Sequence, residues 1–168
     1  VSGIDLDEHG SVPVVQSIPG RALLEAAGGI INQGVIALGD QELSLLGGDL
    51  TNSGRLQGSG SIDNLLLNLP AGEVHVTAGE QMHFTAVGAQ SNAGRIVALG
   101  NAGQSADIEF QGKLTNVALT GYLRASHGAL RFHGGVRNES RLTVSTGTVS
   151  WDVENQAVAA LLVRTNVR

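Results

Sequence analysis

The side chains best suited to bind a ligand recur at one position of the sequence. Arg55, Arg95 and Arg141 each lie three residues after an asparagine and directly before an aliphatic residue, and Val35 and Tyr122 take the equivalent place in other segments. Guanidinium groups bind carboxylates through paired hydrogen bonds, and a phenol offers an amphipathic ring. The position therefore predicts a stripe that binds carboxylates or sugar rings. A second interpretation needs no ligand, because exposed strand positions also favour long or β-branched side chains.

Catalytic and metal-binding chemistry have little support in the sequence. The acidic residues are scattered, and no GxSxG, P-loop, HExxH or calcium-binding nonapeptide motif occurs. His75, His83, His127 and His133 adjoin apolar or turn positions and are expected to face solvent, and cysteine is absent. The sequence therefore predicts a protein that is not an enzyme, with no catalytic residues, no cofactor and no metal site.

Composition describes a folded domain with an unusual core. Hydrophobic residues make up 42% of the chain and charged residues 15%, which excludes a solvated disordered tail. Aromatic residues make up only 3%, beside 24 glycines, so small aliphatic contacts must fill the interior. With a net charge of −5 and no Lys/Arg cluster, no nucleic-acid partner is expected. The longest apolar run, residues 157–163, is too short for a transmembrane segment.

An asparagine preceded by a small and an apolar residue recurs about every 20 residues, which is typical of solenoid proteins. One step is doubled, and its missing member is placed at "NLPAG", around Gly72. Asparagine tolerates the backbone of a bend, and its amide can both donate and accept, so stacked asparagines predict a structural ladder; a polar binding stripe is the alternative. The ladder is predicted to contain Asn32, Asn52, Asn92, Asn116, Asn138 and Asn155.

Alignment on these asparagines predicts an all-β fold. Apolar residues alternate with period 2 between recurrent glycines, which indicates short strands joined by tight turns. In a single-stranded parallel β-helix, equivalent positions of successive coils lie on top of one another. We therefore expect a β-solenoid of about six to seven coils, with one short helix near residues 20–27, where "PGRALLEAAG" could form two turns. A core aromatic column is predicted from Phe84, Phe110, Phe132 and Trp151.

The ends of the chain differ from the repeats. Residues 1–27 are expected to form an N-terminal strand or cap, residues 28–163 the solenoid, and residues 164–168 a C-terminal tail. The end coils of a β-helix have unpaired edges, so both ends are candidates for self-association as well as for capping. Whether residues 1–27 pack on their own coil or on another molecule stays open. The apolar residues predicted for this role are Ile4, Leu6, Val12 and Val14 at one end and Val158, Leu161, Leu162 and Val163 at the other.

The segments "GGDLTNSGRLQGSGSI", "SNAGRIVALG" and "SHGALRFHGGVRNESRLTVSTGTVSWDVEN" resemble the Gly/Asn-rich repeats of bacterial secreted and surface proteins. Autotransporter passenger domains, filamentous-haemagglutinin-like exoproteins and PEP-CTERM-type surface proteins carry such repeats. The resemblance spans roughly Gly28 to Val163. It implies a right-handed solenoid, an extracellular or bacterial cell-surface location, and a role in adhesion, matrix or surface structure.

These observations predict a non-enzymatic extracellular structural or adhesive module that self-assembles end to end into filaments or matrix. The expected partners are other copies of the chain, or an extracellular glycan or host surface. The alternative function is a carbohydrate-binding or polysaccharide-cleaving β-helix. An intertwined trimeric β-prism is the alternative architecture.

Overall fold

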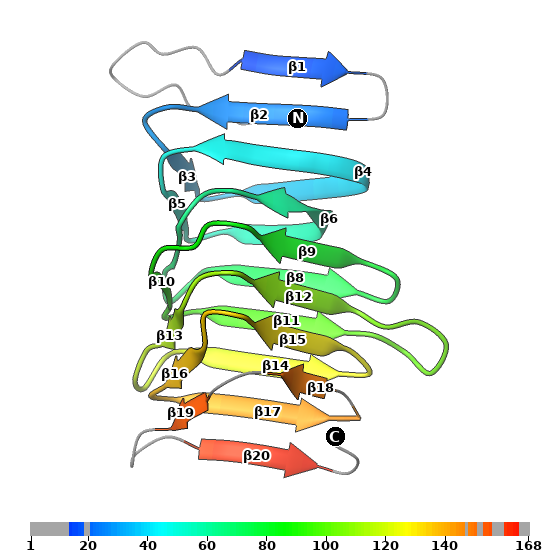
Figure 1. Cartoon of the computed structure of the whole chain (residues 1–168), viewed down its shortest axis with the longest axis vertical. Coiled ribbons are helices and arrows are strands. Elements are labelled where there is room, and N and C mark those ends of the chain that lie inside the picture. Colours follow the sequence, from blue (N-terminus) through cyan, green and yellow to red (C-terminus); the bar gives the residue numbers. More distant parts are fainter. Residues whose placement is uncertain (1–13, 19–20, 147, 151–152, 156–159, 165–168) are drawn as a thin grey trace.

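The computed structural model describes residues 14–18, 21–146, 148–150, 153–155 and 160–164, and the side chains of residues 23–39 and 44–146. Within these ranges all regular structure is β-strand, and no helix is present that could cross a membrane. The strands form stacked coils, with the N-terminal strands at one end and the C-terminal strands at the other (Figure 1). The chain is a parallel β-solenoid, which confirms the predicted fold class.

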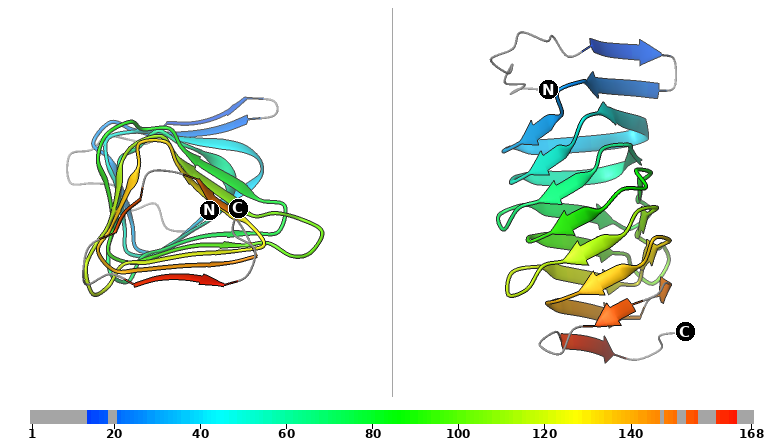
Figure 2. Two further views of the ribbon diagram at one scale, coloured as in Figure 1. Left: turned by 60° about the horizontal axis from the view of Figure 1, so that its bottom comes forward. Right: turned by 60° about the vertical axis from the view of Figure 1, so that its left-hand side comes forward.

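Each coil contributes strands to three faces, which form a roughly triangular section in Figure 2. Seen from the C-terminal end, the chain winds counter-clockwise as it approaches the viewer, so the solenoid is right-handed (Figure 2). Pairing runs between successive coils of one chain, as a solenoid requires.

The first face contains β8 (Glu73–Thr77), β11 (Arg95–Leu99), β14 (Tyr122–Ser126), β17 (Arg141–Ser145) and β20 (Ala160–Arg164). The second contains β9 (Gln81–Phe84), β12 (Asp107–Phe110), β15 (Ala129–Phe132) and β18 (Thr148–Ser150). The third contains β3 (Ile30–Asn32), β5 (Leu50–Asn52), β7 (Leu66–Asn68), β10 (Gln90–Asn92), β13 (Leu114–Asn116), β16 (Val136–Asn138) and β19 (Val153–Asn155).

In the first coils a single long strand spans the first and second faces. β4 (Val35–Gly47) and β6 (Arg55–Ile62) run through the corner, and β6 pairs with β8 by one half and with β9 by the other. Gly58 lies at this bend with φ +94°, where a Cβ would approach the Leu38 carbonyl oxygen to 1.8 Å. Only glycine fits such a backbone, so Gly58 lets the strand turn without a break.

The core consists of side chains stacked in register, as the alternation of the sequence predicts. Ile36, Leu56, Val74, Ile96, Leu123 and Leu142 form one continuous column beneath the first face. Beneath the second face, Phe84 stacks on Phe110 with ring centroids 4.5 Å apart, and Phe110 on Phe132 at 5.5 Å. Trp151 lies outside the described residues.

Residues 21–27 are not helical, so the prediction of a short helix near residues 20–27 was wrong. β2 (Arg21–Ala26) pairs in parallel with β4 and in antiparallel with β1 (Val14–Ile18). A helix of two turns is marginal in isolation, because few residues share the cost of nucleation. Pairing on both edges, with Leu24 packed against the core, outweighs the helical propensity of the segment. β1 and β2 therefore pack on their own solenoid.

The apolar ends are only partly within the described residues. Val14 lies in β1, and Leu161, Leu162 and Val163 lie in β20, which pairs with β17. The backbone of Asn155 pairs with that of Asn138. The predicted positions Ile4, Leu6, Val12 and Val158 lie outside the described residues.

One polar side chain interrupts an apolar column of the core. Gln90 takes the place that Leu50, Leu66 and Leu114 occupy in neighbouring coils, is 3% exposed, and its Oε1 has no partner among the described residues. We expect Gln90→Leu to raise the free energy of unfolding by about 1–2 kcal/mol, because an unsatisfied buried group is replaced by apolar contact. Urea titration checks this, with Ser91→Leu, at the outward neighbour, as the control. If Gln90→Leu instead lost stability, the hydrogen bond from Gln90 Nε2 to the Ala86 carbonyl (3.3 Å) would stabilise the fold more than the apolar contact of leucine does.

Candidate functional site: the arginine column

A ladder of asparagine side chains fixes the corner between the third face and the first. Each amide nitrogen donates to the amide oxygen of the asparagine in the next coil, at 2.7–2.8 Å. The doubled step of the sequence is filled by Asn68, the first residue of the "NLPAG" segment. The observed ladder is Asn32, Asn52, Asn68, Asn92, Asn116 and Asn138.

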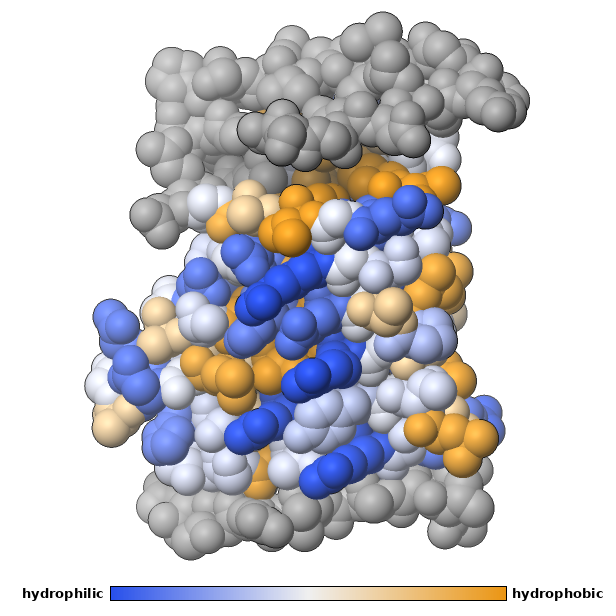
Figure 3. Space-filling model, turned by 180° about the vertical axis from the view of Figure 1, so that it is seen from behind, coloured by the Kyte–Doolittle hydropathy of each residue, from blue (hydrophilic) through white to orange (hydrophobic). Residues whose placement is uncertain are grey.

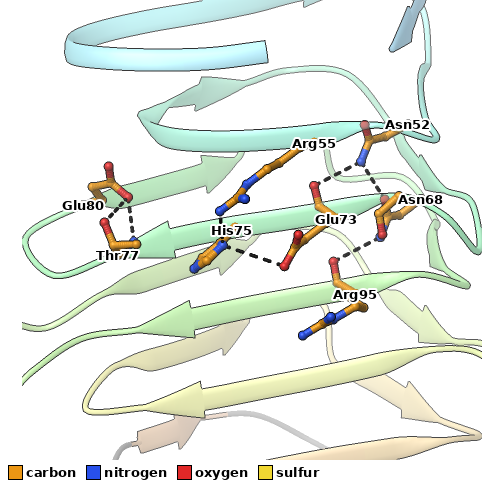
Figure 4. Close-up of polar contacts among 9 residues, drawn as sticks. Asn52, Arg55, Asn68, Glu73, His75, Thr77, Glu80 and Arg95 are labelled. Carbon is orange, nitrogen blue, oxygen red and sulfur yellow. Dashed lines mark hydrogen bonds and ion pairs between the residues drawn. The ribbon is translucent and has the colours of Figure 1, made fainter. Parts of the chain in front are cut away.

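The same amide nitrogens also hold the first residue of five strands, β6, β8, β11, β14 and β17. Asn52 Nδ2 donates to the Glu73 carbonyl at 3.3 Å, and Asn68 Nδ2 donates to the Arg95 carbonyl at 3.3 Å (Figure 4). Equivalent bonds reach the carbonyls of Arg55, Tyr122 and Arg141. The buried ladder therefore sets the backbone position of five outward side chains that follow the corner: Arg55, Glu73, Arg95, Tyr122 and Arg141.

These outward side chains form one continuous column in register, which we call the arginine column. Its order across the coils is Val35, Arg55, Glu73, Arg95, Tyr122 and Arg141. The structure thus brings together all four residues of the predicted ligand stripe and adds Glu73. Glu73 directly precedes the core residue Val74, as Arg55 directly precedes Leu56. The alignment of core residues could therefore have identified Glu73 as a member of the column.

In the C-terminal half of the column, Tyr122 lies between two guanidinium groups. Arg95 Cζ is 5.9 Å and Arg141 Cζ 5.3 Å from the Tyr122 ring centroid. These are cation–π distances, and with one arginine on each neighbouring strand both ring faces are covered. Arg124 lies beside them, two residues after Tyr122 on the same face. The view from behind shows strongly hydrophilic side chains gathered across the middle of this face (Figure 3).

In the N-terminal half, the column forms an internally paired cluster. Arg55 Nη2 lies 2.5 Å from His75 Nδ1, and Glu73 Oε1 lies 3.7 Å from the same nitrogen (Figure 4). Because Arg55 must donate, His75 Nδ1 accepts, and the proton of the neutral ring lies on Nε2. The His75 side chain is only 15% exposed, so the expectation that it faces solvent freely was wrong. It points outward, but its neighbours in the column cover it.

The environment of His75 disfavours its charged form. Burial, and then the nearby Arg55 guanidinium, lower the pKa of His75 from its ordinary value of 6.5, while Glu73 acts in the opposite direction. A protonated Nδ1 would also oppose the Arg55 donor. The cluster therefore holds a neutral imidazole at neutral pH.

This shift predicts how stability depends on pH. Because the folded pKa of His75 is below the unfolded one, the unfolded chain binds more protons just below pH 6.5, and stability is lost as pH falls through that window. We expect His75→Gln to lose less stability than the wild type between about pH 7.5 and pH 5 in urea titrations. His127→Asn, at an exposed histidine, is the control. If His75→Gln and the wild type lost stability equally as pH falls, His75 would not be a source of the pH dependence of stability.

The second face carries a separate polar cluster. Glu109 lies between His83 and His133, with oxygen–nitrogen distances of 3.3 Å and 2.5 Å, and Arg131 pairs with Asp107 at 3.4 Å. Within the described part of the chain, no group of three or more acidic, histidine or cysteine side chains is arranged to hold a metal ion. The Arg131 guanidinium and the two imidazole rings of this face thus lie against carboxylates of the same face.

Comparison with protein-family models, curated proteins and solved structures finds no match to the chain. The fold and the site define the class of protein, which is a right-handed parallel β-solenoid with an internal asparagine ladder and an arginine column on one lateral face.

Proposed function

We propose that the chain is a non-enzymatic structural or adhesive module that acts outside the cell or on a bacterial cell surface. The observation that carries the proposal is the stack itself, in which each coil pairs with its neighbours and outward side chains form straight columns. Such an architecture suits a rigid spacer that presents repeated contacts along its length. The resemblance of the repeats to bacterial surface proteins supports the location.

Self-assembly end to end is part of this proposal, and the open strand edges support it. Among the described residues, β3 pairs with β5 alone and β19 with β16 alone, so each has one unpaired edge. Unpaired edges accept further strands, and contact between unlike ends builds open filaments.

One amide of β3 allows a specific test. The Ile30 amide donates to the Asp49 carbonyl in the next coil, at 2.8 Å. Successive amides of a strand point to opposite sides, so the Ile31 amide faces the open edge. Ile31→Pro removes this donor at an exposed position and leaves the pairing with β5 in place.

We expect the wild type to form rods that grow with concentration in sedimentation velocity and negative-stain electron microscopy. Ile31→Pro is expected to shorten or abolish them, while Ile31→Thr, which keeps the amide, should behave as the wild type. A wild-type chain that stays monomeric at every concentration contradicts self-assembly. If Ile31→Pro formed rods as long as those of the wild type, the open edge of β3 would be excluded as a site of self-assembly.

A further inference from the structure

Three arginines of the first face have no carboxylate partner. Arg95, Arg124 and Arg141 form no ion pair with any described residue, whereas Arg131 and Arg137 on the other faces pair with Asp107 and Glu139. The chain as a whole carries a net charge of −5, so acidic residues outnumber basic ones. Even Glu73, which neighbours Arg95 in the column, forms no ion pair with it. Their hydrogen-bond donors are therefore free for an external anion.

The spacing of these guanidiniums suits an anion with separated charges. Arg95 and Arg141 begin strands on either side of β14, so their backbones are two strand spacings apart, roughly 9.5 Å. Arg124 lies two residues along β14 from Tyr122, roughly 6.6 Å. Double-stranded DNA carries one charge per about 1.7 Å of its axis, which is far denser than this patch. Acidic polysaccharides carry their charges one or two sugar rings apart, which matches it better.

The surroundings argue against nucleic acids and peptides as the ligand. Both faces of the Tyr122 ring are covered by arginines, so the ring offers no platform on which a base can stack. The first face is the middle of a sheet with its backbone groups paired to neighbouring coils, so an extended peptide has no strand edge to join here.

From this charge complementarity we propose that Arg95, Arg124 and Arg141 bind a linear acidic polysaccharide laid along the solenoid axis. This inference rests on the adhesive role proposed above and names its ligand class. The guanidiniums donate charge-assisted hydrogen bonds to carboxylate or sulfate groups. Tyr122 is a positioning residue, because its ring holds Arg95 and Arg141 apart.

The test measures binding of the immobilised protein to alginate, a polyuronate, and to heparin, a sulfated polymer. Dextran is the neutral control, and poly-glutamate and single-stranded DNA represent other polyanions. We expect alginate or heparin to bind, more weakly as salt rises, and dextran not to bind. Preference for one of the two identifies the acidic group.

Variants locate the site. The double variant Arg95→Gln/Arg141→Gln is expected to lose about tenfold or more in affinity, because two charge-assisted contacts are removed. Arg137→Gln removes the same charge from the third face and should bind as the wild type. Tyr122→Ala should weaken binding but keep the slope of log Kd against log salt, since the charges remain, whereas the double variant should reduce that slope. Tyr122→Phe should restore the wild-type affinity.

Three results would overturn the inference: no binding of either acidic polysaccharide, equal binding of poly-glutamate or DNA, or full affinity in the double variant. The assay reads polymer binding and not sedimentation. A chain that forms no filaments but binds alginate would therefore contradict self-assembly alone, and a chain that forms filaments but binds neither polymer would contradict this inference alone.

Discussion

Replacing Phe110 by Asp is expected to leave no folded protein. Phe110 is fully buried, and its ring stacks on Phe84 with an angle of 5° between ring planes and on Phe132 with an angle of 13°. Loss of a buried phenylalanine costs about 3–5 kcal/mol, and a buried carboxylate without a partner costs several more. Together these approach or exceed the 5–15 kcal/mol that stabilises a typical domain. Far-UV circular dichroism should show a loss of strand signal.

Two variants make this result specific. Val87→Asp places the same charge at a loop position that is 83% exposed, and it should fold as the wild type. Phe110→Leu keeps the site apolar and is expected to cost only about 1–2 kcal/mol, from lost volume and ring stacking. If Phe110→Asp and Val87→Asp gave the same spectrum and the same unfolding midpoint, the inward position of Phe110 would be wrong.

The columns were predictable from the sequence because residues at equivalent positions of successive repeats lie next to one another in a solenoid. Ile96 and Leu142 each lie four residues after an asparagine, and that spacing alone placed them in one column. The stripe of Arg55, Arg95, Tyr122 and Arg141 followed from the same rule. Alignment failed where a coil departs from the pattern, as at Asn68, where the turn before the next strand is longer than in its neighbours.

The second coil shows another limit of the repeat. Gly60 resembles a turn glycine in sequence, yet it lies inside β6, paired with Leu43 and Met82. Ile62, two residues later, takes the place that Phe84 has in the next coil. A long strand that bends at Gly58 does not need a second turn, and no local pattern reveals which glycine of the segment bends.

Properties that depend on contacts with neighbouring strands could not be predicted from the sequence alone. His75 alternates with apolar residues as an exposed residue does, but Arg55, which lies near it only after the coils stack, helps to cover it. Burial and this guanidinium together lower the pKa of His75. The prediction of a helix near residues 20–27 was wrong for a related reason. The local sequence favours a helix, but pairing with β1 and β4 makes β2 a strand.

Replacing Asn92 by Ala is expected to lower the free energy of unfolding by about 2–5 kcal/mol. Asn92 accepts from Asn68 Nδ2 at 2.7 Å and donates to Asn116 Oδ1 at 2.8 Å, in a position with no exposed surface. The change leaves one amide oxygen of the ladder without its donor and one amide nitrogen without its main acceptor. Alanine can replace neither contact, and this position has no surface in contact with solvent.

The end of the ladder provides the comparison that tests cooperativity. Asn32 has one asparagine neighbour among the described residues, Asn52, so Asn32→Ala breaks one link of the ladder and not two. We expect this variant to cost about half as much as Asn92→Ala in urea titrations. Equal costs would mean that the asparagines act as separate corner residues. A larger cost at Asn92 would show that the ladder is a continuous support, on which the positions of Arg95 and Tyr122 depend through their carbonyls.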